Sequence, residues 1–111
     1  MDKMNIIVVV SDTLRRDHLP CYGSRTVLTP NLSDLAQRSL VFEDFYAASF
    51  PTVPARADLL TGKYTFTYMG WEPLPAGEVP LPARLNETGM LTTAIVDTPF
   101  LVRNGYGYDR G

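Results

Sequence analysis

The chain has very few of the side chains that build disulfides and zinc sites. Cys21 is its only cysteine and His18 its only histidine among 111 residues. One thiol cannot form an internal disulfide, and one thiol with one imidazole cannot supply the four ligands of a structural zinc site. We therefore expect a reducing, cytoplasmic setting, with Cys21 as a packed thiol and His18 as a surface histidine or one that only supports a neighbouring ligand.

The chain also lacks a strong net charge and a long apolar run. Ten Lys and Arg against twelve Asp and Glu give a net charge of −2, without the basic cluster of a nucleic-acid-binding protein. The longest uninterrupted apolar run, Ile6 to Val10, is far too short to span a membrane. We expect no nucleic-acid partner and no membrane partner. With 45% hydrophobic residues, the chain can form one core, so we expect a single domain over residues 1–111 with no separate second domain.

Strand signals recur along the chain. The β-branched run at residues 5–10 does not alternate with polar residues, which is typical of a strand buried on both faces of a parallel sheet. A strand or extended segment is predicted at residues 40–47, and a further strand at residues 92–96. Because helix signals separate these strands, the pattern favours an α/β fold with right-handed crossovers.

Helix signals follow the same alternation. The predicted helices are one of roughly ten residues from Pro30, one over residues 55–60 ended by Gly62, and one over residues 82–88 closed by Gly89. Residues 63–82 are rich in Pro, Gly and aromatics, which indicates a long ordered loop. Its aromatic residues could line a substrate pocket, although packing as a small satellite core is the more common use.

A hydroxyl group precedes the second predicted helix. Pro54 fits the first helical turn, so Thr52 lies at or just before the helix N-terminus, and Arg56 follows one turn later. The unpaired amides and positive dipole end of that turn favour a phosphate or sulfate group beside Thr52, and Arg56 can add a planar set of donors. The alternative is that Thr52 is merely a helix N-cap.

Two aspartates follow predicted strands. Asp12 lies just past the strand at residues 5–10, where open α/β sheets place their ligands, and its carboxylate suits a divalent cation. Asp12, Thr52 and perhaps Thr13 are too few groups to close a metal site, and Asp12 could instead cap a turn. Asp97, followed by Thr98 and Pro99, is better interpreted as a turn residue than as a ligand.

These motifs, taken together, resemble one family. Residues 7–23 (IVVVSDTLRRDHLPCYG) resemble the opening of the sulfatases, within the alkaline-phosphatase-like superfamily, and residues 52–62 (TVPARADLLTG) resemble the sulfatase signature C/S-x-P-x-R with its following L-L-T-G. The other matching segments, in the family's order, are TPNL at 29–32, VFED at 41–44, ETGM at 87–90 and YDRG at 108–111. The resemblance implies the N-terminal part of an incomplete, mostly parallel sheet flanked by helices.

The resemblance also implies roles. Thr52 takes the nucleophile position, Arg56 orients it, and Asp12, Thr13 and Thr52 are implied metal ligands for a divalent ion such as Ca²⁺, Mg²⁺, Mn²⁺ or Zn²⁺. The implied substrate is a small anionic ester. Family members are several times longer, with further ligands beyond the point corresponding to Gly111. The isolated chain is therefore expected to be inactive and marginally stable, or to pair with itself or another chain through an uncovered sheet edge or core face.

Two positions depart from the family pattern. Well-known sulfatases oxidise Cys or Ser at the Thr52 position to formylglycine, whereas threonine carries a methyl group on the carbon that would become the aldehyde, so no formylglycine is expected. Relatives that cleave phosphodiesters use an unmodified Thr, which makes a phosphate or phosphonate ester at least as plausible as a sulfate. Thr13 stands where many members have a second metal-binding Asp.

Two other classes of protein compete with the hydrolase. One is a non-catalytic anion-binding or assembly module derived from a truncated sulfatase, which weak uptake of divalent cations would identify. The other is a small flavodoxin-like nucleotide-binding domain, which is disfavoured because no glycine-rich phosphate-binding loop follows the first predicted strand.

Overall fold

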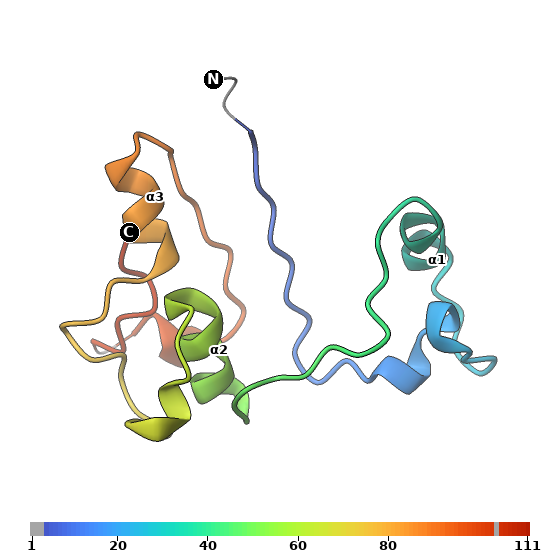
Figure 1. The fold of residues 1–111 in the computed structure, drawn as a ribbon, viewed down its shortest axis with the longest axis horizontal. Coiled ribbons are helices and arrows are strands. Elements are labelled where there is room, and N and C mark those ends of the chain that lie inside the picture. The colour runs from blue at the N-terminus through green and yellow to red at the C-terminus, as the bar shows by residue number, and fades with distance from the viewer. Residues whose placement is uncertain (1–3, 104) are drawn as a thin grey trace. The chain divides into compact units, whose positions relative to one another are not determined.

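The computed structural model describes residues 4–103 and 105–111, which divide into two units at Phe45 and Tyr46. Helix α1 (Pro30–Gln37) belongs to the first unit. Helices α2 (Thr52–Thr61) and α3 (Leu81–Glu87) belong to the second, and Figure 1 labels all three. Each helix lies within two or three residues of its predicted position. The expectation of one domain stays a prediction.

The three predicted strands are not formed among the residues that the structure describes. Residues 5–10, 40–47 and 92–96 contain no assigned strand, and Figure 1 draws the first of these segments as an extended trace without an arrow. Ile7 and Val9 are 87% and 85% exposed, and Ile95 is fully exposed. A strand is defined by hydrogen bonds to a neighbouring strand. A run of β-branched residues indicates that a segment can form a strand. It does not specify which other segment pairs with it.

The first unit is open. None of its described residues is buried, and the apolar stripe predicted for α1 stays half exposed, with Leu32 at 43% and Leu35 at 47%. Helix α1 packs against the short 3-10 turn Pro20–Tyr22. The Tyr22 hydroxyl donates a hydrogen bond to the Phe42 carbonyl at 2.8 Å, which joins the middle of this unit to its C-terminal segment.

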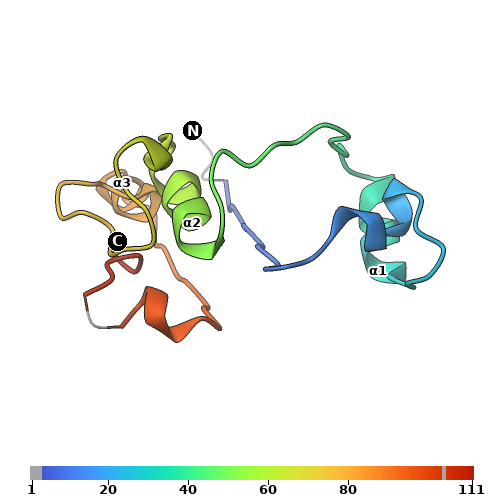
Figure 2. The same ribbon diagram turned by 90° about the horizontal axis from the view of Figure 1, so that it is seen from below.

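The second unit contains the hydrophobic core. Val53 and Ala57 of α2 are fully buried, and they form one cluster with residues from the loop and the C-terminal segment: Met69, Leu74, Leu101 and Tyr108. Helices α2 and α3 contact each other, and both views show them side by side (Figures 1 and 2). The predicted nucleophile helix is therefore the central element of this core.

The predicted loop at residues 63–82 contains one 3-10 turn, Thr65–Thr67, and otherwise follows an irregular path. Its aromatic side chains are about half exposed or more, so the expected satellite core is wrong: Tyr64 70%, Phe66 59%, Tyr68 49% and Trp71 52%. Aromatic rings pack well against other rings at a surface, and Trp71 stacks on Phe100 with ring centroids 5.6 Å apart.

Within the described residues, no helix has the length and apolar content to cross a bilayer.

Candidate functional site

Helix α2 presents Thr52 at its first turn. Pro51 takes the N-cap position, Thr52 is the first helical residue, and Pro54 lies in the first turn as predicted. The first helical hydrogen bond runs from the Ala55 amide to the Pro51 carbonyl at 3.1 Å. The first residues of a helix have no carbonyl within the helix to accept their amides, and these amides carry the positive end of the dipole. This is the anion-favouring environment expected for the nucleophile.

Thr52 and Arg56 share one face of α2. They are four residues apart within the helix, and both are partly exposed. Side chains four residues apart are neighbours on a helix surface. Pro54 lies on another face and is buried, together with Val53 and Ala57. The helix therefore packs by one side and leaves Thr52 and Arg56 on a side that a ligand can reach.

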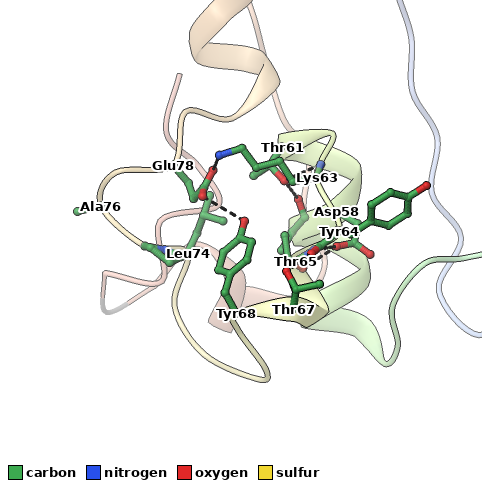
Figure 3. Close-up of polar contacts among 12 residues, drawn as sticks. Asp58, Thr61, Lys63, Tyr64, Thr65, Thr67, Tyr68, Leu74, Ala76 and Glu78 are labelled. Carbon is green, nitrogen blue, oxygen red and sulfur yellow. Dashed lines mark hydrogen bonds and ion pairs between the residues drawn. The ribbon is translucent and has the colours of Figure 1, made fainter.

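Asp58 faces the turn that follows α2. Its Oδ1 accepts two hydrogen bonds from Thr65, one from the amide at 2.8 Å and one from the hydroxyl at 2.6 Å (Figure 3). Burial acts to raise the pKa of the Asp58 carboxyl, but the Ser49 hydroxyl and the hydrogen bonds from Thr65 outweigh it and hold the pKa below its usual range. Asp58 therefore stays ionised and ties the turn to the helix.

The end of α2 is tied to the loop by a second polar group. The Glu78 carboxylate accepts from Lys63 Nζ at 2.7 Å and from the Tyr68 hydroxyl at 3.1 Å, and Figure 3 shows it between the two. Its side chain is only 13% exposed. The hydrogen bond from Lys63 is the main reason why the pKa of Glu78 lies below its usual range. This group holds the loop across the C-terminal end of the helix.

Arg110 closes the other side of the loop. Its guanidinium donates to the carbonyls of Leu74, Pro75 and Ala76 at 2.9 to 3.1 Å, and also to the Gly107 carbonyl at 2.9 Å. The rigid arrangement of five donors suits such a cluster of carbonyls. Arg110 belongs to the YDRG segment at residues 108–111, and no pattern in that segment predicts that its guanidinium binds backbone carbonyls.

Asp12 and Thr13 lie in the first unit, in a turn that follows the extended segment. Thr13 has a φ of 58°, in the left-handed region that β-branched residues rarely adopt. Such outliers concentrate at functional sites. Since Thr52 belongs to the other unit, the convergence of Asp12 and Thr52 on one cation stays a prediction.

The predicted metal ligands do not complete a site by themselves. In residues 4–103 and 105–111, no three side chains of His, Cys, Asp or Glu are grouped so that they could hold a metal ion. Asp12, Thr13 and Thr52 contain a single carboxylate among them, whereas Ca²⁺ takes six to eight oxygen ligands. The described residues therefore do not fit a divalent cation without additional ligands.

The other candidate residues lie away from α2 in sequence. His18 is a surface residue as expected, and its Nδ1 lies 3.0 Å from Asp17 Oδ1. Cys21 was expected to be packed and is instead exposed, because the open first unit buries none of its described residues. Asp97 lies in a bend and accepts a hydrogen bond from the Thr98 hydroxyl at 3.0 Å, as expected of a turn residue.

Sequence reasoning missed Asp58, Thr65 and Glu78. A signal existed for Asp58, since a carboxylate between Ala57 and Leu59 interrupts an apolar run in a helix expected to pack. Its partner Thr65 lies beyond the helix in an irregular loop, and no periodic pattern relates the two residues. Such a contact depends on the path of the loop, which only the structure shows.

Comparison with known proteins decides the family. A family model described as Sulfatase matches residues 4–109. The chain belongs to the sulfatase family. Human arylsulfatase A is 38% identical over 98 residues, which cover 79% of this chain and 19% of that protein. Human iduronate 2-sulfatase is 37% identical over 62 residues, covering 56% of this chain and 11% of that protein.

A bacterial relative gives a similar match. The N-acetylgalactosamine-6-O-sulfatase of Bacteroides thetaiotaomicron is 42% identical over 62 residues, 56% of this chain and 12% of that protein. The sulfatase-family chain thus spans between about a tenth and a fifth of the length of these relatives. No solved structure gives a significant match to it. Membership of the sulfatase family implies an alkaline-phosphatase-like α/β fold.

Proposed function

We propose that this chain carries the nucleophile of a metal-dependent ester hydrolase that cleaves a sulfate, phosphodiester or phosphonate ester. The observation that carries the proposal is the placement of Thr52 as the first residue of α2, with Arg56 one turn later on the same face. In a sulfatase-family chain, this is the signature position of the nucleophile. The amides of the first turn supply donors for the anionic group of the ester.

Each side chain has a defined part in the proposed reaction. The Thr52 hydroxyl attacks phosphorus or sulfur and loses its proton to solvent, while the ester bond breaks and the departing oxygen takes up a proton and leaves as the alcohol. Water then hydrolyses the ester formed on Thr52. Arg56 orients Thr52 and donates hydrogen bonds to the non-bridging oxygens, where charge develops. Asp12, Thr13 and Thr52 would contribute to a larger ligand set around a divalent cation, whose chemistry is to polarise the ester and lower the pKa of the attacking hydroxyl.

The nucleophile determines which esters are reasonable substrates. The relatives are named as sulfatases, which supports a sulfate ester. However, the β-carbon of Thr52 bears a methyl group, so oxidation cannot give an aldehyde, and the attacking group is an unmodified alcohol. An unmodified alcohol is the nucleophile of phosphodiesterases of the same superfamily. We therefore propose phosphodiester and phosphonate esters as substrates on at least an equal footing with sulfate.

Removal of the Thr52 hydroxyl tests the proposal. We expect Thr52→Val, which keeps the shape of the side chain, to lower ester hydrolysis at least about 10³-fold, while Thr52→Ser retains measurable turnover. The measurement is hydrolysis of aryl phosphodiester, phosphonate and sulfate esters, with and without a chelator, by protein expressed from the complete open reading frame that encodes the chain.

Thr61→Val is the matched control. Thr61 lies at the other end of the same helix, where its hydroxyl donates to the Ala57 carbonyl at 2.7 Å. Equal activity of the Thr52→Val and Thr61→Val proteins would refute the assignment of the nucleophile. Binding of the esters without any turnover in the unaltered protein would favour the non-catalytic anion-binding module.

A further inference from the structure

Asp58 lies between the two segments that flank the proposed nucleophile helix. On one side is Thr65, which is fully buried in the 3-10 turn after α2 and donates both its amide and its hydroxyl to Asp58 Oδ1. The Thr65 hydroxyl also lies 3.5 Å from the Pro54 carbonyl in the first turn of α2. It has a single proton, and the shorter contact, at 2.6 Å, is the one to Asp58.

On the other side is Ser49, which precedes α2 and is only 4% exposed. Ser49 Oγ and Asp58 Oδ2 are both buried, and neither has a hydrogen-bond partner among the described residues. The Ser49 hydroxyl nevertheless contributes to the lowered pKa of Asp58, after burial, which acts in the opposite direction. A buried hydroxyl and a buried carboxylate oxygen are complementary, and each is costly to leave unpaired.

We propose that Asp58 is a positioning residue for Thr52: its carboxylate holds the turn after α2 against the helix, and its buried second oxygen is the acceptor for the buried Ser49 hydroxyl in the segment before α2. The inference rests on the proposed function, since it assigns Asp58 a role in presenting the proposed nucleophile. Asp58 lies on the face of α2 that carries the buried Pro54, four residues earlier, and away from the face of Thr52 and Arg56. It therefore acts through the backbone and does not touch the ester.

The route from Asp58 to Thr52 is short. Only Phe50 and Pro51 separate Ser49 from Thr52, and the φ angles of Pro51 and Pro54 are restricted by their rings. If the Ser49 side chain is fixed by Asp58, few backbone angles between Ser49 and Thr52 can still vary. The first turn is held from another side by the Tyr108 hydroxyl, which lies 3.4 Å from the Val53 carbonyl. Releasing Ser49 or Thr65 should therefore loosen the start of the helix and the direction of the Thr52 hydroxyl.

The test removes one hydroxyl at a time. Ser49→Ala removes the buried hydroxyl that we assign to Asp58 Oδ2, and Thr65→Val removes an observed donor to Asp58, whereas Thr65→Ser keeps that donor. Thr67→Val is the matched control, because the Thr67 hydroxyl lies in the same turn and donates to the Tyr64 carbonyl at 2.9 Å. The readout is the χ1 angle of Thr52, measured by NMR from three-bond coupling constants to its γ-methyl group.

We expect one dominant Thr52 rotamer in the unaltered protein, in Thr65→Ser and in Thr67→Val, and a mixture of rotamers in Ser49→Ala and Thr65→Val. In protein that turns over an ester, these last two variants should lower kcat about ten- to a hundredfold with KM changed less than threefold. A single unchanged rotamer in both variants would overturn the inference. Unfolding of both, with Thr67→Val folded, would also overturn it, since the cluster would then be a requirement of the fold.

The rotamer measurement does not depend on turnover. If Thr52→Val is as active as the unaltered protein, the proposed function fails, whatever the couplings show. If Thr52→Val is inactive and the rotamer is insensitive to Ser49 and Thr65, the proposed function stands and only the role of Asp58 is lost. The two proposals can therefore fail separately.

Discussion

At the scale of single residues, the second unit is organised by side chains that satisfy backbone groups and by a few buried polar atoms. Tyr108 illustrates this organisation, because it is 7% exposed in the core and its hydroxyl lies 3.4 Å from the carbonyls of both Val53 and Glu72. The sequence predicted Thr52, Arg56 and Asp97 in their observed local settings. It could not predict the partners of Asp58, Thr65 and Tyr108, because no periodic pattern relates these residues to the groups that they contact.

The titration of Tyr108 gives a prediction at this scale. Burial raises the pKa of Tyr108 to about 12, against about 10 in an unfolded chain. Because the pKa is raised in the folded state, the stabilisation is fully present below pH about 10 and is lost as the pH rises toward about 12. We expect Tyr108→Phe to flatten this alkaline loss of stability, measured as the free energy of unfolding against pH.

The control for this prediction is Tyr64→Phe, which removes a phenol that is 70% exposed. It should keep the alkaline slope of the unaltered protein. The same slope in Tyr108→Phe as in the unaltered protein would show that Tyr108 does not cause the loss.

At the scale of elements, helices were predictable and strands were not. Capping and breaking residues act locally, so Pro30, Gly62 and Gly89 mark helix boundaries close to those observed. A strand depends on a partner that can lie anywhere in the chain, and none of the predicted strands finds one among the described residues. Among the described residues, the structure therefore contains the predicted helices, which depend on local signals, and not the predicted strands, which depend on a distant partner.

The end of α2 supplies the prediction for elements. Gly62 ends the helix with a φ of 68°, and its amide donates to the Asp58 carbonyl at 2.8 Å. An alanine in this left-handed conformation destabilises the folded state by about 1 kcal/mol relative to glycine. We expect Gly62→Ala to lower the free energy of unfolding by about that amount, measured by denaturant titration.

Gly70→Ala is the matched control, since Gly70 has no positive φ and a Cβ there would meet nothing within 4 Å. Its free energy of unfolding should fall by less. An equal or larger loss for Gly70→Ala would contradict the assignment of Gly62 as the residue that requires the left-handed conformation.

At the scale of the whole molecule, the second unit carries a core, whereas none of the described residues of the first unit is buried. The apolar segment of residues 5–10 is exposed together with Leu91 and Ile95 of the second unit. Exposed apolar segments of this kind promote association, so self-association stays a prediction for the isolated chain. The match to the sulfatase model over residues 4–109 implies an α/β fold, and the place of these segments in a sheet stays a prediction.

The most direct test of the central claim is to trap the group transferred to Thr52. If the Thr52 hydroxyl displaces the alcohol of a phosphonate or phosphate ester, a bond forms between Thr52 Oγ1 and phosphorus while the ester oxygen leaves with a proton. Protein expressed from the complete reading frame is quenched with acid during turnover, digested and analysed by mass spectrometry. We predict the phosphoryl or phosphonyl adduct on Thr52, and its loss in Thr52→Val. Turnover with the adduct on another residue, or undiminished turnover by Thr52→Val, would contradict the account.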